Sequence, residues 1–394
     1  MTRHFTFVCY LVATLCTEMA FGQFASAQVA LKVPKVAPGS PIAYLYVSSS
    51  PSSGKNEINA YSVSTDGALT VIAGSPLAAN VQYMAANGKY LVGSNGTDID
   101  SFSIQSNGAL KEEGTINAQA FNTSDCGGPF ALFFDRSGTT LYDLDLYSDC
   151  ANNAYQFFDI AGSQGRLNYL GMTSASSPVF DVPLRFIGNN QYAYGSLCYQ
   201  YDPRIFGFQR GSDGALTFTN FNAPIPDAPS GGFYCPNMAA ADSTNHVVVP
   251  LEPFNSDWEP SGQTRLATYT ADSSGNLTSA STASNMPTTL VTNKSNIWVA
   301  DISISPSGEL LAVAGAGGLQ IFHFNGANPI THYSGLLTTD AISQLSWDSA
   351  NHLYAISQTS GKLFVFSVTP TKVSQVTGSP HSISSPLAVV VVAK

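Results

Sequence analysis

The chain has 394 residues, of which 11% are charged, and 26 acidic against 16 basic residues give it a net charge of −10 at pH 7. This balance disfavours a nucleic-acid partner, because phosphate binding needs a basic surface that displaces counterions. The sequence also has no basic amphipathic helix of the kind that binds a membrane surface.

Residues 1–27 have the pattern of a signal peptide. Arg3 precedes an apolar stretch at 5–15, and the small residues 25–27 (Ala-Ser-Ala) offer a cleavage site. Glu18 would interrupt any spanning helix, and the apolar stretch is shorter than the ~20 residues that a membrane span needs. We therefore expect an exported protein, whether periplasmic, at the cell surface or secreted, with no membrane insertion after cleavage.

The remaining chain is expected to contain a leader, residues 28–41, and one repeat domain, residues 42–394. The repeat is clearest at 58–76 (INAYSVSTDGALTVIAGSP), where an apolar strand, a tight turn with Gly and a second strand follow one another. The other copies lie at 99–116, 154–172, 205–224, 266–287, 319–337 and 363–383. Their mean spacing of roughly 51 residues is in the range of propeller blades.

A second hairpin lies between successive copies, for example at 299–314 (VADISISPSGELLAVA) and 342–356 (ISQLSWDSANHLYAI). Each period therefore holds four short strands. Four-stranded antiparallel blades repeated around an axis form a β-propeller, so the seven copies predict an all-β fold of seven blades.

The two ends of the repeat domain predict how the ring closes. The first copy begins at 43–47 (AYLYV), which matches a second strand, and the strand 387–393 (LAVVVVA) is left over at the C-terminus. We expect this last strand to pair into the first blade, which would remove two exposed edges. The alternative is a C-terminal strand that remains an edge.

Four cysteines lie beyond the signal peptide, and in an exported chain they are expected to form disulfides. In the blade register, Cys126 and Cys150 flank the first two strands of blade 3, whereas Cys198 ends the second strand of blade 4 and Cys235 precedes the first strand of blade 5. We predict the pairs Cys126–Cys150 and Cys198–Cys235. A zinc site is the alternative, disfavoured because no CxxC spacing occurs.

The long insertions are expected on one face. With strands labelled a to d from the axis outward, the a–b and c–d turns are short. The insertions fall in the b–c and d–a connections, at 117–129, 198–203, 220–236, 251–264 and 281–297. Long loops in a compact repeat fold are usually functional, so we predict the binding surface there, over blades 3 to 5 and the channel mouth. Neutral variation of loop length is the alternative.

The blade pattern at 43–76, at 205–216 (IFGFQRGSDGAL) and at 299–314 resembles the lactonase-like seven-bladed propellers, which include propeller-type bacterial 6-phosphogluconolactonases and YVTN repeat proteins. The resemblance covers nearly the whole mature chain. It implies the propeller and, for the enzymes of the family, hydrolysis of a sugar lactone. Those enzymes present an Arg-His pair on an inner strand, and the equivalent stretches 127–138, 235–245 and 298–308 lack it. No catalytic residue is therefore carried over from the family. No cofactor or metal site is expected, although metal-assisted chemistry by scattered carboxylates stays open.

Six residues are candidates for ligand binding. Glu252, Asp257, Trp258 and Glu259 combine carboxylates with an aromatic face, a mixture that suits a sugar ring or a cation, although solvated loop charges would look the same. Arg185 and Arg204 could bind a carboxylate or phosphate in bidentate fashion.

Two further polar patterns are interpreted as structural. Asp143, Asp145 and Asp149 alternate along the second strand of blade 3, which would suit calcium, but we expect an exposed blade edge. His246 and His352 occupy equivalent a–b turns, and their recurrence indicates a role in the turn.

The function expected from these observations is a monomeric, exported, lactonase-like propeller that binds a small molecule, glycan or protein on its loop-rich face. The alternatives are an extracytoplasmic hydrolase of a sugar lactone and a structural cell-surface module. The sequence has no G-x-S-x-G, P-loop or H-E-x-x-H motif. Whether the protein is an enzyme stays open, because a propeller site is built from residues far apart in the sequence and leaves no local motif.

Overall fold

The computed structural model describes residues 39–394 except residue 53 and the segments 122–127, 147–153, 161–163, 174–181, 200–201, 220–222, 229–230 and 294–295. The expected signal peptide, most of the leader, and Cys126, Asp149 and Cys150 lie outside the described residues. Ser40–Lys394 forms one compact unit. In the described part of the chain, no helix is long and apolar enough to cross a membrane.

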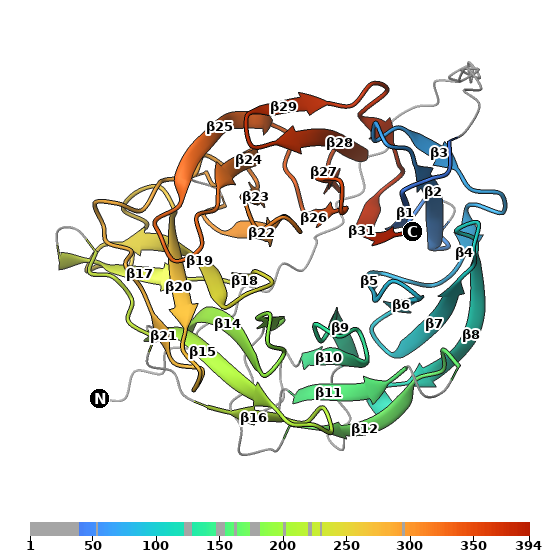
Figure 1. The fold of residues 1–394 in the computed structure, drawn as a ribbon, viewed down its shortest axis with the longest axis horizontal. Helices are drawn as coiled ribbons and strands as arrows, with labels where there is room; N and C mark the ends of the chain where they lie inside the picture. Colours follow the sequence, from blue (N-terminus) through green and yellow to red (C-terminus); the bar gives the residue numbers. More distant parts are fainter. Residues whose placement is uncertain are drawn as a thin grey trace, which may run out of the picture. The chain divides into compact units, whose positions relative to one another are not determined.

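Seven antiparallel sheets form a ring, as the sequence predicts (Figure 1). From the inner strand outward, the first three blades are β31 (Pro386–Ala393), β1 (Ala43–Ser49), β2 (Glu57–Val63) and β3 (Leu69–Val71); β5 (Tyr83–Ala86), β6 (Tyr90–Ser94), β7 (Asp98–Ile104) and β8 (Leu110–Asn117); and β9 (Gly128–Phe134), β10 (Thr140–Leu146), β11 (Ala154–Asp159) and β12 (Asn168–Met172).

The other four blades follow the same order. They are β13 (Arg185–Phe186), β14 (Tyr192–Tyr199), β15 (Asp202–Arg210) and β16 (Leu216–Phe218); β17 (Phe233–Pro236) with β18 (Ala240–Ala241), β19 (His246–Phe254), β20 (Arg265–Ala271) and β21 (Leu277–Thr278); β22 (Val299–Ile304), β23 (Leu310–Gly315), β24 (Gly318–His323) and β25 (Thr331–Thr338); and β26 (Gln344–Trp347), β27 (His352–Ser357), β28 (Lys362–Thr369) and β29 (Lys372–Gln375). The short strands β4 (Leu77–Ala78) and β30 (His381–Ser382) pair with β2 and β28.

The predicted ring closure is confirmed. The C-terminal strand β31 pairs antiparallel with β1, in a register that runs from Ala43 opposite Ala393 to Ser49 opposite Pro386. The backbone N–H of Lys394 also donates to the carbonyl of Ile42 at 3.0 Å. The last strand thus supplies the inner strand of the first blade, so β1 lies inside its sheet and is not an edge strand.

The core lies between neighbouring blades, because each blade is covered on both faces. On β10, Tyr142 and Leu144 pack against blade 4, whereas Leu141 packs against blade 2. Successive residues of such a strand point to opposite faces, and both faces are buried, so the strand does not alternate between apolar and polar residues.

Tyrosines of the second strands connect blades 1, 3 and 4 to the next blade through the Gly of its c–d turn. The hydroxyl of Tyr142 donates to the carbonyl of Gly214 at 2.6 Å, and that of Tyr194 donates to Gly275 at 2.8 Å. Gly275 has φ 83°, and an added Cβ there would lie 2.5 Å from the ring of Tyr192. The Gly of the repeated turn is thus required both by its backbone conformation and by the neighbouring blade.

The a–b turns are short and polar, as expected, and they carry the two recurrent histidines. Nδ1 of His246 lies 2.7 Å from Oδ2 of Asp242, and Nδ1 of His352 lies 2.8 Å from Oδ2 of Asp348. Each Asp also accepts the backbone N–H of its histidine. The structural interpretation of these histidines is confirmed.

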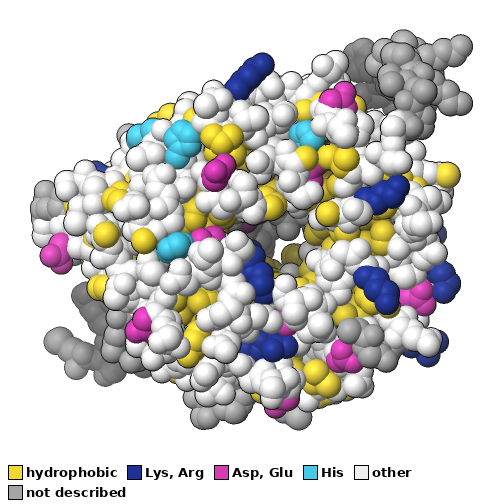
Figure 2. Space-filling model, in the orientation of Figure 1, with side chains coloured by type: hydrophobic (Ala, Val, Ile, Leu, Met, Phe, Trp, Pro, Cys, Tyr) yellow, Lys and Arg dark blue, Asp and Glu magenta, His cyan; other side chains and the backbone are white. Residues whose placement is uncertain are grey.

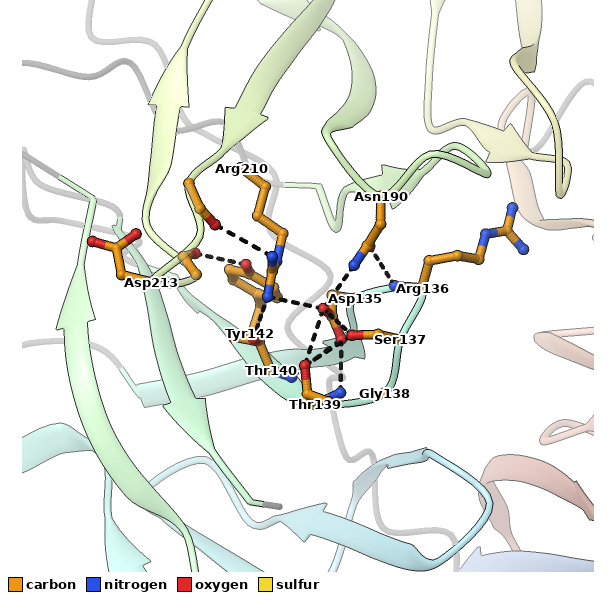
Figure 3. A network of polar contacts seen from close by, with 12 residues as sticks. Asp135, Arg136, Ser137, Gly138, Thr139, Thr140, Tyr142, Asn190, Arg210 and Asp213 are labelled. Carbon is orange, nitrogen blue, oxygen red and sulfur yellow. Dashed lines mark hydrogen bonds and ion pairs between the residues drawn. The ribbon is translucent and has the colours of Figure 1, made fainter. Parts of the chain in front are cut away.

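A polar network joins the same turns of blades 3 and 4 (Figure 3). Asp135 receives the guanidinium of Arg210 at 3.0 Å and the side-chain amide of Asn190 at 2.9 Å. Asn190 in turn accepts the backbone N–H of Arg136 at 2.7 Å. The side chain of Arg136 points away from Asp135 and donates to the carbonyls of Ala241 and Asp242 in blade 5. These contacts hold three blades in register at this end of the channel.

Two expectations are wrong. Asp143 and Asp145 are 0% exposed, so they do not lie on an exposed edge. Their strand β10 lies between β9 and β11, and blade 2 packs against this face of the sheet. The connection 198–203 is not a long insertion either, because β14 continues to Tyr199 and β15 begins at Asp202.

Candidate functional site

Aromatic side chains gather where the b–c loop of blade 5 meets the next d–a connection. Phe233 at the start of β17 is the Cα partner of Phe254 at the end of β19, and their rings stack with centroids 5.5 Å apart. Trp258, in the b–c loop, packs on Phe233 at 4.0 Å. Trp298, just before β22, lies 6.1 Å from Phe254 and is 38% exposed. We refer to these four residues as the aromatic cluster.

A cavity of about 170 Å³ adjoins the aromatic cluster, with Phe254 in its wall. Its other walls include Tyr234, Asn255, Gln263 and Arg265. One terminal nitrogen of Arg265 donates to the carbonyls of Ala283 at 2.9 Å and Met286 at 3.0 Å, which fixes the guanidinium. The cavity therefore combines aromatic faces with amide and guanidinium donors, the composition of a site for a small polar ring.

Glu252 lies on the strand that leads into the b–c loop of blade 5, not in the loop itself. It belongs to β19, is 2% exposed and accepts the hydroxyl of Thr264. Burial raises the pKa of Glu252 to about 7, although the hydrogen bond from Thr264 opposes that shift. A carboxyl in this environment changes its charge near neutral pH.

The structure separates the four acidic and aromatic candidates of this loop. Asp257 and Glu259 are exposed, and their backbone N–H groups donate to Oδ1 of Asn255 at 2.9 Å each. Trp258 joins the aromatic cluster with φ 66°. The structure thus does not bring Glu252, Asp257 and Glu259 together into one carboxylate site.

The predicted disulfide Cys198–Cys235 is present. It joins the end of β14 to β17 and so ties blade 4 to blade 5 beside the aromatic cluster. Glu252 is the Cα partner of Cys235. The other predicted pair, Cys126–Cys150, lies outside the described residues.

The two arginine candidates lie on different strands and opposite faces of blade 4. Arg185 on β13 is the Cα partner of Tyr194, which is in turn the partner of Gly207. Arg204 lies three residues from Gly207 on β15, and an odd offset along a strand reverses the side-chain direction. Arg185 and Arg204 are therefore not a convergent pair.

The charge of Arg185 instead acts on Asp301. The two residues belong to the inner strands of blades 4 and 6, which blade 5 separates. Burial lowers the pKa of Arg185 while Asp301 opposes the shift. Burial raises the pKa of Asp301 to about 6, although Arg185 and the backbone N–H groups of Leu345 and Ile302 favour its ionised form. The positive charge of an arginine thus acts on a buried carboxyl whose pKa lies near neutral pH.

The channel wall has an apolar part as well. Phe130, on the inner strand of blade 3, is 42% exposed and lies 5.3 Å from the ring of Tyr83 on the inner strand of blade 2. Figure 2 shows one face of the molecule hollowed at its centre, with Lys or Arg side chains on the border of the hollow. The channel thus presents an aromatic side and a charged side.

The sequence did not indicate Asp301 or three members of the aromatic cluster, Phe233, Phe254 and Trp298. A lone Asp in an alternating strand looks like a solvated position, and the aromatics come from three separate connections. For Phe233, Phe254 and Trp298, the only sequence signal was that an aromatic residue lies where a long loop meets a strand. In the described part of the chain, no three His, Cys, Asp or Glu side chains gather into a metal-binding group.

No protein-family model and no curated protein sequence matches the chain. Its fold is that of a proposed 6-phosphogluconolactonase from Bacteroides fragilis NCTC 9343, at a TM-score of 0.64 and 14% identity over 91% of this chain and 99% of that one. A proposed 6-phosphogluconolactonase from Bacteroides uniformis ATCC 8492 gives 0.61 and 14%, over 90% and 100%. A hypothetical selenium-binding protein from Sulfolobus tokodaii gives 0.61 and 10%, over 90% and 94%. The resemblance seen in the sequence is thus confirmed for the fold, which proteins of different description share.

Proposed function

We propose that this protein is a binding module that takes a small carbohydrate at the cavity beside the aromatic cluster. The observation that carries the proposal is the arrangement of Phe254 and Tyr234 around a cavity whose polar wall includes Gln263 and the fixed guanidinium of Arg265. Aromatic faces stack on the apolar face of a sugar ring, and amide and guanidinium donors bind its hydroxyl groups. The volume of about 170 Å³ is below the ~300–1,000 Å³ of sites for drug-sized ligands, which favours a ligand of one ring.

Tryptophan fluorescence tests this proposal. Of the three tryptophans of the chain, Trp258 and Trp298 belong to the aromatic cluster, whereas Trp347 is buried between inner strands at 8% exposure. A panel of neutral and acidic monosaccharides should include a ligand that changes the emission in a saturable way. Replacing Arg265 by Ala should weaken that binding, and replacing the exposed Glu259 by Gln should not. A flat response to the whole panel, together with no retention on a glycan column, would contradict the proposal.

A second candidate function is hydrolysis of a sugar lactone in the channel, which the Arg185–Asp301 pair favours. An ionised Asp301 could accept a proton from a water molecule that attacks the lactone carbonyl, and Arg185 could stabilise the negative charge that develops on the carbonyl oxygen. Because the base must be ionised, the rate should rise with pH through about 6, the pKa of Asp301.

The test of this second function is turnover of an aldonolactone, followed with a pH indicator. Asp301→Asn should abolish turnover and Arg185→Lys should reduce it, whereas Asp257→Asn in the exposed loop should leave it unchanged. Loss of turnover that is equal in all three variants would show that the channel pair is not responsible.

We also propose that the protein is exported and acts as a monomer. The N-terminal pattern of residues 1–27 and the disulfide Cys198–Cys235 support export, because disulfides persist in oxidising compartments. The closure of the ring within one chain supports the monomer, because the last strand pairs with the first strand of the same chain and not with a second copy.

A further inference from the structure

Three polar side chains are fully buried where blade 3 packs against blade 2. Asp143 and Asp145 lie two residues apart on β10, and Gln156 on β11 is the Cα partner of Asp143. All three are 0% exposed. The apolar residues of the same blade interface include Val92, Ile99, Leu141, Phe158 and Ile160.

The hydrogen bonds of this group are incomplete. Nε2 of Gln156 donates to Oδ2 of Asp145 at 3.0 Å and to the carbonyl of Ala118 at 3.2 Å, which uses both of its hydrogens. Among the residues that the structure describes, no donor reaches either carboxylate oxygen of Asp143 or Oε1 of Gln156. Buried acceptors of this kind are rare, because each has lost its water without gaining a partner.

A proton on Asp143 would satisfy only part of the group. Burial, together with the neighbouring charge of Asp145, raises the pKa of Asp143 well above its usual range. A protonated Asp143 could donate to Oε1 of Gln156, but its second oxygen would still lack a donor. A divalent cation would contact both oxygens of Asp143 and Oε1 of Gln156, and would balance two carboxylate charges.

We propose that a hard divalent cation, Ca²⁺ in the first place, binds between blades 2 and 3 at Asp143, Asp145 and Gln156. Oxygen ligands of carboxylate and amide type are those that Ca²⁺ prefers, and Ca²⁺ accepts less regular coordination than Mg²⁺ does. The carbonyl of Ala118 lies in the same space. Because the ligands come from a closed blade interface, the cation would be acquired during folding and would stabilise the folded ring.

Calcium content and thermal stability together test this site. The purified protein is unfolded and refolded in a chelator, and Ca²⁺, Mg²⁺ or Na⁺ is then added to separate refolded samples. We expect one tightly bound Ca²⁺ per chain by elemental analysis and a melting temperature that rises with Ca²⁺. Asp143→Asn should weaken Ca²⁺ binding by about tenfold or more, since ligand charge sets the affinity of such sites. Asp100→Asn, a half-buried carboxyl of blade 2 bonded to Thr115, is the matched control.

Gln156→Glu covers the case in which Asp143→Asn does not fold. With a cation, the added carboxylate should make the melting temperature depend more steeply on Ca²⁺. Without a cation, a third buried carboxylate should destabilise the protein at every Ca²⁺ concentration. The proposal is overturned if the refolded wild type carries no divalent metal, its melting temperature ignores all three ions, and Asp143→Asn is at least as stable as the wild type, the result expected for a protonated Asp143.

Discussion

Glu252→Gln should stabilise the protein at neutral and alkaline pH but not in acid. The carboxyl is 2% exposed and its pKa is raised from 4.5 to about 7 by burial. The folded protein therefore binds this proton more tightly than the unfolded chain does, so the ionised form destabilises the fold as pH rises between these two values. Glutamine has the same shape, keeps an oxygen for Thr264 and never ionises.

The magnitude follows from the shift. Each pKa unit corresponds to ~1.4 kcal/mol, so the shift of Glu252 amounts to at most about 3 kcal/mol above pH 7, and relaxation of the protein around the buried charge reduces this to ~2 kcal/mol. With an unfolding entropy of ~2.1 cal/mol/K per residue over the compact unit Ser40–Lys394, that free energy corresponds to a rise in Tm of about 3 °C. Below about pH 4.5 both states hold the proton, and the two proteins should melt together.

Thermal unfolding by circular dichroism, measured across this pH range, checks the prediction. Glu259→Gln serves as the control, because it removes an exposed carboxylate from the loop that follows β19. A Glu252→Gln protein that is no more stable than the wild type at about pH 8, or one whose advantage is equal in acid and in alkali, would refute the reasoning.

Three further predictions concern other parts of the fold. Cys198→Ser should lower the stability by roughly 3–4 kcal/mol and Tm by about 5 °C, because the disulfide closes a loop with a sequence separation of 37; calorimetry with and without reductant measures this. Val389 on β31 is 1% exposed, so Val389→Asp should lower the free energy of unfolding in urea by more than about 4 kcal/mol. Val71 is 62% exposed, so Val71→Asp should lower it by less than about 0.5 kcal/mol. Burial alone would raise the pKa of Asp348, but hydrogen bonds from the ring and backbone N–H of His352 and from Tyr354 outweigh burial and lower it. Asp348→Asn should therefore lower the free energy of unfolding by ~1–3 kcal/mol at neutral pH. This loss should shrink in urea unfolding as the pH falls through the acidic range, where Asp348 of the wild type becomes protonated.

Local patterns predicted the architecture because they recur. Six of the seven c–d turns have a Gly with positive φ, and an apolar residue stands at or next to the start of the strand after each turn, so the period was visible in residues 58–76 and in the later copies. The leftover strand before Lys394 and the blade register of Cys198 and Cys235 then predicted ring closure and one disulfide, both of which are present.

Burial and convergence were decided by the tertiary structure. Period-two alternation tells which residues share a strand face, but not what covers that face, and for this reason Asp143 and Asp145 were expected in solvent although blade 2 lies over them. The charges of Arg185 and Asp301 act on each other although the residues belong to the inner strands of two different blades, 4 and 6.

The sequence by itself therefore determined the repeat, its strand order and the closure, since all of these depend on contacts between residues near in the chain or on a repeated register. Only the folded ring decided which polar groups lose their water and which aromatic side chains meet. Those outcomes depend on the packing of one blade against another, and no local pattern encodes the neighbour that a side chain will face.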